Sequence, residues 1–89
     1  MKQIPKHLHT LFWDVNIATF DPLEHPQYTI SRILELGDKE AITWMKGIFS
    51  KSQIEYILKV DERLSPKSAN FWAIIFGVPF HEVAALKQK

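Results

Sequence analysis

The chain has 89 residues, of which 46% are hydrophobic, 12% aromatic and 24% charged, enough apolar material for one packed core. This length excludes a second folded unit, so we expect residues 1–89 to form a single helical domain. Eleven Lys and Arg against ten Asp and Glu give a formal net charge of +1, which excludes the strongly basic balance of a dedicated nucleic-acid binder. The absence of cysteine excludes disulfides, thiolate zinc sites and cysteine nucleophiles.

The first 25 residues have an irregular pattern. Residues 5–11 predict a short helix or turn, residues 12–16 (FWDVN) an extended segment, and residues 20–26 (FDPLEHP), with their two prolines, a loop or single turn. Polar residues interrupt the apolar segment that a secretion signal needs, and no part of the chain approaches the roughly 20 apolar residues of a membrane span. We therefore expect a cytoplasmic protein with no membrane partner.

Start and stop signals predict two helices after this region. The first covers residues 26–36, because Pro26 suits the first position of a helix and Gly37 suits a position just past its end. The second covers residues 39–49, because the carboxylate of Asp38 can cap it and apolar side chains recur at three- and four-residue spacings.

Two further helices form a pair joined by a short connection. Ser50 and Gln53 stand three residues apart, as in a capping box, and predict a helix over residues 51–60. Ser65 is followed by a proline and predicts the start of a helix over residues 66–76, where a glycine follows.

The last of these helices contains the run FWAIIF, residues 71–76, which is apolar on nearly all sides and is typical of a buried central helix. A final short helix is expected over about residues 79–86. The predicted fold is therefore all-α, a small bundle of four to five short helices with a helix-turn-helix-like pair at residues 51–76. The side chains expected inside the core are Ile33, Met45, Ile57, Phe71 and Ile75.

No arrangement of residues predicts catalysis. The histidines lack the spacing of a metal site, since His7 and His9 are two apart and His25 and His81 have no second ligand one helical turn away. The paired carboxylates lie in polar loop sequence, and neither a glycine-rich phosphate loop nor a nucleophile motif occurs. We expect a non-catalytic protein without metal, cofactor or catalytic residues.

The helix pair at residues 51–76 permits a DNA-binding interpretation. In helix-turn-helix proteins the N-terminal half of the second helix enters the major groove, although helical hairpins that only build a core are commoner. This interpretation requires Lys67 and Asn70 to point outward while residues 71, 74 and 75 point inward. The DNA contacts would then come from Lys59, Arg63, Ser65, Lys67, Ser68 and Asn70.

Three Trp, two Tyr and six Phe are a large aromatic load for so short a chain. Most are expected in the core. Because the interior volume of such a domain is limited, some rings are expected at the surface, where an apolar patch usually marks a protein interface. The candidates for contact with a larger partner or a second copy of the chain are Trp13, Trp44, Tyr56 and Phe80.

Several segments taken together resemble a known family. In order, they are FWDVN at 12–16, YTISRILELGD at 28–38, Trp44, RLSPKSANFW at 63–72 and FGVP at 76–79. They are similar to a family of small bacterial proteins of unassigned function, often found beside a nucleotidyltransferase-type toxin of the abortive-infection class. The resemblance implies an antitoxin-like protein that binds such a toxin or another protein partner, or forms a homodimer. A DNA-binding transcriptional regulator is the alternative, and one protein can combine both roles.

Overall fold

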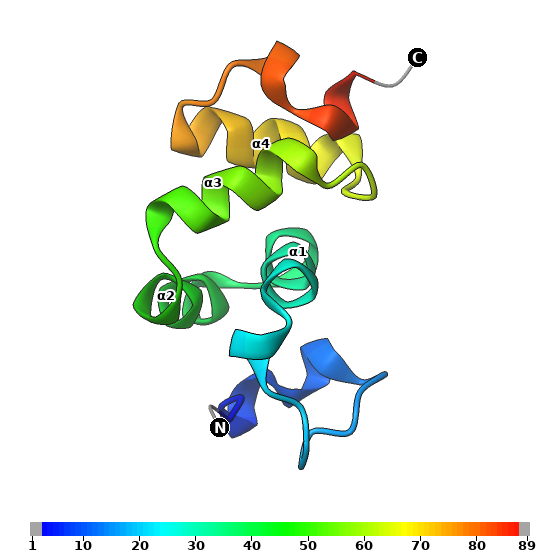
Figure 1. Ribbon diagram of the computed structural model, residues 1–89, viewed down its shortest axis with the longest axis vertical. Coiled ribbons are helices and arrows are strands. Elements are labelled where there is room, and N and C mark those ends of the chain that lie inside the picture. Colours follow the sequence, from blue (N-terminus) through cyan, green and yellow to red (C-terminus); the bar gives the residue numbers. More distant parts are fainter. Residues whose placement is uncertain (1–2, 88–89) are drawn as a thin grey trace.

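The computed structural model describes residues 3–87, and within them the protein is all-α, with no strand. The α-helices are α1 (Pro26–Leu36), α2 (Lys39–Ile48), α3 (Lys51–Val60) and α4 (Pro66–Phe76). The 3-10 helices are η1 (Lys6–Phe12), η2 (Pro22–Glu24), η3 (Phe80–Glu82) and η4 (Ala84–Leu86). In Figure 1 the N-terminal segment lies at one end of a molecule of 38 × 23 × 21 Å, and α4 with the C-terminal turns lies at the other.

The four α-helices confirm the helices predicted from local signals. The carboxylate of Asp38 caps α2, Ser50 and Gln53 complete the capping box of α3, and Ser65 caps α4. The second helix is one residue shorter than expected, because Phe49 is its C-cap and has extended backbone angles. These ends follow from hydrogen bonds within a few residues of chain, which is why they can be read from sequence.

The N-terminal region contains one departure from the expectation. The segment after η1 turns instead of extending: Trp13 has helical backbone angles, and the Val15 amide donates to the Phe12 carbonyl at 3.3 Å. The turn lets Phe12 enter the core, where it is fully buried, while Asp14 stays at the surface and accepts a hydrogen bond from Arg32 of α1. The single turn expected in the proline-rich segment is present as η2, capped by Asp21.

The C-terminal region also differs from the single helix predicted over 79–86. It forms two 3-10 turns, η3 and η4, because Val83 between them is extended and fully buried. Directing this side chain into the core requires the chain to leave the helical path at that residue. The break therefore anchors the C-terminal segment against α3 and α4, with which η4 packs.

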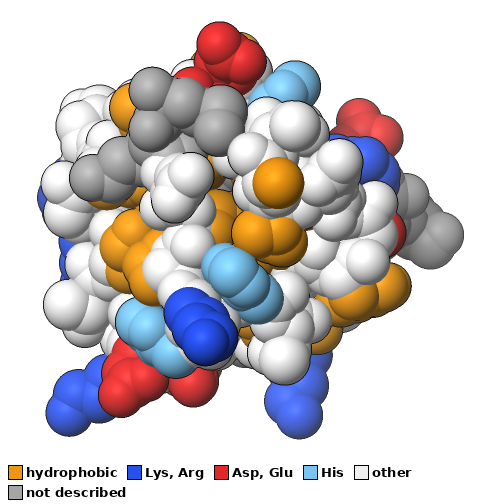
Figure 2. Space-filling view, turned by 90° about the horizontal axis from the view of Figure 1, so that it is seen from below, with side chains coloured by type: hydrophobic (Ala, Val, Ile, Leu, Met, Phe, Trp, Pro, Cys, Tyr) orange, Lys and Arg blue, Asp and Glu red, His pale blue; other side chains and the backbone are white. Residues whose placement is uncertain are grey.

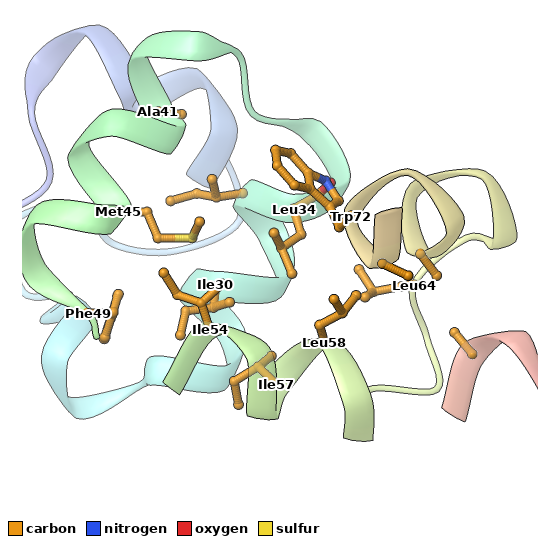
Figure 3. Packing of buried hydrophobic residues seen from close by; sticks show 14 of the residues in the cluster. Ile30, Leu34, Ala41, Met45, Phe49, Ile54, Ile57, Leu58, Leu64 and Trp72 are labelled. Carbon is orange, nitrogen blue, oxygen red and sulfur yellow. The ribbon is translucent and has the colours of Figure 1, made fainter. Parts of the chain in front are cut away.

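The central helix of the bundle is α1. It packs against α2, α3 and α4 and also against η1 and η2. Figure 3 shows Ile30 and Leu34 of α1 facing side chains from the neighbouring helices. The buried residues of this core, in order along the chain, include Leu8, Phe12, Ile30, Ile33, Leu34, Met45, Phe49, Ile54, Ile57, Leu58, Leu64, Trp72 and Val83.

The expectation that α4 is the central buried helix is wrong. Phe71 and Ile75, predicted in the core, are 52% and 53% exposed, and Ile74 between them is 63% exposed. The side of α4 that enters the core consists of Trp72 and two alanines, whose small side chains let the helix approach its neighbours closely. Ile33, Met45 and Ile57 are buried as predicted.

Candidate functional site

Helix α4 is positioned by its two ends and by one long side chain. Ser65 accepts a hydrogen bond from the Ser68 amide at 3.2 Å, and Gly77 ends the helix with a φ of 69°, in the left-handed region. The indole Nε1 of Trp72 donates to the Leu34 carbonyl of α1 at 2.7 Å. This buried contact sets the rotation of α4 and determines which of its side chains face outward.

The outward side of α4 is apolar over its second half. Phe71, Ile74 and Ile75 lie one helical turn or one residue apart, so they form one continuous surface, and each is more than half exposed. Phe80 of η3 is 52% exposed and lines a hollow of about 370 Å³ together with Ile74. We call these four residues the α4 face.

Hollows lie on both sides of the α4 face. On the α1 side a hollow of about 630 Å³ reaches from Glu35 to Asn70 and is bounded by Phe71 and Ile74. On the α2 side two hollows of about 500 and 300 Å³ meet at Ile75. The exposed side chains therefore stand as a ridge between concave surfaces, a shape that can interdigitate with another protein.

The opposite end of the molecule is a contrast. Figure 2 shows that end, where hydrophobic side chains reach the surface in separate areas between histidine, basic and acidic side chains. Trp13 is 68% exposed, but its ring packs against the guanidinium of Arg32, 4.6 Å from the ring centroid. Its exposure is thus linked to an intramolecular contact.

The four residues predicted for a protein interface do not form one surface. Phe80 belongs to the α4 face. Trp13 directly follows η1, in the N-terminal segment at the other end of the molecule. Tyr56 of α3 is exposed but lines none of the hollows beside α4, and Trp44 is half-buried against the core. Sequence reasoning missed Phe71, Ile74 and Ile75, because a run of apolar residues does not show which side of a helix is buried.

The residues predicted to contact DNA have mixed surroundings. Lys59 forms an ion pair with Glu82 at 3.3 Å, and Arg63 forms one with Asp61 at the same distance. Among the others, Lys67 and Asn70 are exposed on the first half of α4, whereas the hydroxyl of Ser65 is used by the helix cap. Lys67 and Asn70 therefore point outward, as the DNA interpretation required. Its other requirement is not met, because Phe71, Ile74 and Ile75, which were expected to point inward, are all exposed.

A cluster around Arg32 was not predicted from the sequence. Its guanidinium donates to both carboxylate oxygens of Asp14 at 3.1 and 2.9 Å, to the Leu11 carbonyl at 2.9 Å and to the Tyr28 hydroxyl at 2.6 Å. It also lies 4.7 Å from the centroid of the Tyr28 ring. These partners lie up to 21 residues from Arg32 in the sequence, so no local motif predicts the cluster.

The carboxylates of Asp14, in this cluster, and of Asp61, at the end of α3, both have lowered pKa values. Hydrogen bonds from Arg32 and then Tyr28 lower the pKa of Asp14 to about 2, and burial raises the pKa of Tyr28. Burial alone would raise the pKa of Asp61, but hydrogen bonds from the Ser31 hydroxyl and from Arg63 lower it. Both carboxylates are ionised at neutral pH, so neither is poised as a general acid.

Three of the histidines each have a different partner. His9 hydrogen-bonds the Ile4 carbonyl at 3.0 Å through Nε2, while His7 lies 3.8 Å from Glu40 and His81 lies 3.8 Å from Glu82. Within residues 3–87 no three side chains of metal-binding type come together. In the same part of the chain, every helix is too short or too polar to cross a membrane.

Comparison with known proteins gives one match. The model of a family of unknown function, DUF6922, matches residues 7–58, which extend from η1 into the last turn of α3. No curated protein and no solved structure matches the chain.

Proposed function

The chain belongs to DUF6922, and we propose that it works as a non-catalytic, antitoxin-like protein that binds a protein partner. The observation that carries this proposal is the α4 face. Three neighbouring apolar side chains on one helix, each more than half exposed, are unusual on a soluble monomer and typical of an interface. The fold does not need them in its core, since Trp72 and the alanines already fill that side of α4.

The class of partner comes from the resemblance described above, to small bacterial proteins found beside a nucleotidyltransferase-type toxin. On this proposal the α4 face covers a surface of the toxin and thereby holds it inactive. A homodimer through the same face is the other arrangement that an exposed apolar helix permits.

The experiment is purification of the tagged full-length chain from its native host, followed by co-expression with the protein that co-purifies. We expect a stoichiometric complex with a nucleotidyltransferase-type protein and relief of its growth inhibition. Ile74→Glu places a charge in the middle of the α4 face and should weaken the complex at least about tenfold. Gln27→Glu is the matched control, because Gln27 is exposed in the first turn of α1, away from the α4 face. A chain that stays monomeric at high concentration and retains no partner would remove this function.

DNA binding as a transcriptional regulator is a second proposal, supported by the exposure of Lys67 and Asn70 on the first half of α4. Fluorescence anisotropy with the upstream region of the chain's own gene tests it. We expect affinity to fall with salt, by about one unit of logarithmic slope for each phosphate neutralised, and Lys67→Ala to reduce that slope. Asn70→Ala should cost roughly 1–3 kcal/mol on the preferred sequence only. Affinity equal to that for random DNA would leave the helix pair as part of the core.

A further inference from the structure

The gap between α2 and α4 forms one groove made of two adjoining hollows, which share Lys46 and Ile75. The apolar side chains that line it come from three helices and from the residue that ends α2. They are Ile42, Phe49, Ile54, Phe71, Trp72, Ile75 and Phe76. Helix α2 runs along this groove, and its ten residues span about 15 Å at 1.5 Å per residue. The groove therefore has room for about three turns of a helix.

The rim of this groove is basic. Lys39, Lys46 and Lys51 line it, and all three are exposed. Lys51 forms an ion pair with Glu55 of the same helix, so the charge argument depends on Lys39 and Lys46. Lys46 lies 5.9 Å from the centroid of the Phe76 ring, so its ammonium group stands beside the apolar floor. The one lining carboxylate, that of Asp38, already accepts a hydrogen bond from the Ala41 amide as the cap of α2.

The hollow on the other side of α4 has no such bias. There Lys67 is balanced by Glu35, whose carboxylate accepts a hydrogen bond from the Ser65 amide at 2.9 Å. The two sides of the α4 face therefore differ in charge, although both are bounded by apolar residues of the same helix.

We infer that the groove between α2 and α4 binds an amphipathic helix with an acidic polar side, supplied by the protein partner. An apolar stripe at three- and four-residue spacings would lie on the groove floor, as in other helix-in-groove complexes. Carboxylates on either side of that stripe would meet the lysines of the rim, which fixes the orientation and raises the association rate. A nucleic acid fits less well, because Phe71 is the one ring of the lining that is more than half exposed, whereas single strands stack on successive exposed rings. This inference rests on the proposed function and names the chemistry of the partner's contact.

The probe is a fluorescent amphipathic peptide of about 16 residues, with leucines on one helical stripe and glutamates elsewhere. One control peptide has lysines in place of the glutamates, and a second has glutamines in place of the leucines. With the full-length chain we expect the acidic peptide to bind at least about tenfold more tightly than either control. Amide chemical-shift changes should be confined to α2, α4 and the start of α3.

Variants of the chain locate the contact. Lys39→Glu combined with Lys46→Glu should weaken the acidic peptide at least about tenfold at low salt and should favour the basic peptide instead. Ile75→Gln should weaken binding of the acidic peptide by a similar factor, because it places a polar amide on the groove wall. Lys6→Glu is the matched control, since Lys6 is exposed on η1 and lines neither hollow of the groove, and it should change affinity less than about twofold.

Several outcomes would overturn the inference. Equal binding of the acidic and basic peptides removes the charge argument, and shift changes elsewhere remove the site. A dimer that Ile75→Gln dissociates shows that a second copy occupies the groove. If the native partner needs Ile74 but is indifferent to changes at Lys46 and Ile75, the proposed function stands and this inference fails. If no native partner binds, the proposed function fails while the peptide titration still decides the groove.

Discussion

Arg32 joins the N-terminal segment to α1 through a single guanidinium group. Two of its partners, Asp14 and the Leu11 carbonyl, lie on the chain that precedes the helix, and the rings of Trp13 and Tyr28 flank it. Planar geometry and fixed charge suit arginine to such a site, where a lysine could provide neither the bidentate contact nor the stacking. The cluster explains how an irregular segment is held in one arrangement.

The carboxylate of Asp14 predicts a pH dependence of stability. Its pKa in the folded chain is lowered to about 2 from an ordinary value of 3.8. A lowered pKa means that the ionised carboxylate stabilises the folded state above about pH 4, and that this stabilisation disappears as the pH falls to about 2. Asp14→Asn should therefore be less stable than the wild type at pH 7, and the difference should shrink between about pH 4 and pH 2. Urea unfolding across this range measures it.

The control for this titration is Glu62→Gln. Glu62 is exposed and forms no hydrogen bond or ion pair with the rest of residues 3–87, so its substitution should leave the unfolding free energy nearly unchanged at every pH. A difference between wild type and Asp14→Asn that is as large at pH 2 as at pH 7 would show that the contact with Arg32 does not depend on the charge.

Truncation of two phenylalanines should destabilise the protein by very different amounts. Phe12 is fully buried, so Phe12→Ala should cost about 3–5 kcal/mol and nearly unfold a domain of this size. Phe71 is half exposed and packs edge-to-face with Trp72, so Phe71→Ala should cost only about 1 kcal/mol. Thermal and urea melts of the two variants compare them directly. Equal losses would place Phe71 in the core after all.

At the scale of elements, the helix ends were predictable and the buried faces were only partly so. The caps of α2, α3 and α4 depend on residues three positions apart, which a sequence displays directly. In α1 and α2 the apolar stripe also identifies the buried side, because polar residues occupy the rest. In α4 nearly every residue after Asn70 is apolar, so the pattern carries no information about rotation.

The rotation of α4 is instead determined by residues elsewhere in the chain. Trp72 bonds to Leu34, 38 positions earlier, and this contact turns Phe71, Ile74 and Ile75 outward. The candidate site was missed for the same reason, although Phe80, Lys67 and Asn70 were correctly expected at the surface. The cluster around Arg32 was likewise invisible, since its partners are distant in sequence.

Two glycines at helix positions predict changes of opposite sign. Gly47 lies in α2, and a Cβ there would have no neighbour within 4 Å, so Gly47→Ala should stabilise the protein by about 0.5–1 kcal/mol through helix propensity. Gly77 has a φ of 69°, so Gly77→Ala should destabilise it by about 1–2 kcal/mol through backbone strain, although space for the methyl group is open. Urea midpoints of the two variants give the signs. A stabilising Gly77→Ala would mean that α4 ends differently.

For the whole molecule, α4 has two roles on its two sides. Its inner side completes the core that α1 and α3 begin, and its outer side forms the α4 face. The family match ends at residue 58, before this helix, yet the matched region contains core residues that face it. In Figure 3 Trp72 lies beside Leu34, and Leu64, from the connection before α4, lies beside Leu58.

A fragment of residues 1–61 should therefore fail to fold cooperatively, although it contains the whole matched region. It loses the burial of Trp72, whose removal alone typically costs about 3–5 kcal/mol, together with that of Leu64 and Val83. The total available to a domain of this size is only about 5–15 kcal/mol, so little or none remains. Full-length Ile74→Glu is the control, because it changes only the outer side of α4 and should melt within about 3 °C of the wild type. Circular dichroism melts of both test whether the two sides of α4 are separable. A fragment with a sharp transition near that of the full chain would show that α4 is not needed for the fold. Loss of the cooperative transition in Ile74→Glu would show that the outer side of α4 is needed for the fold.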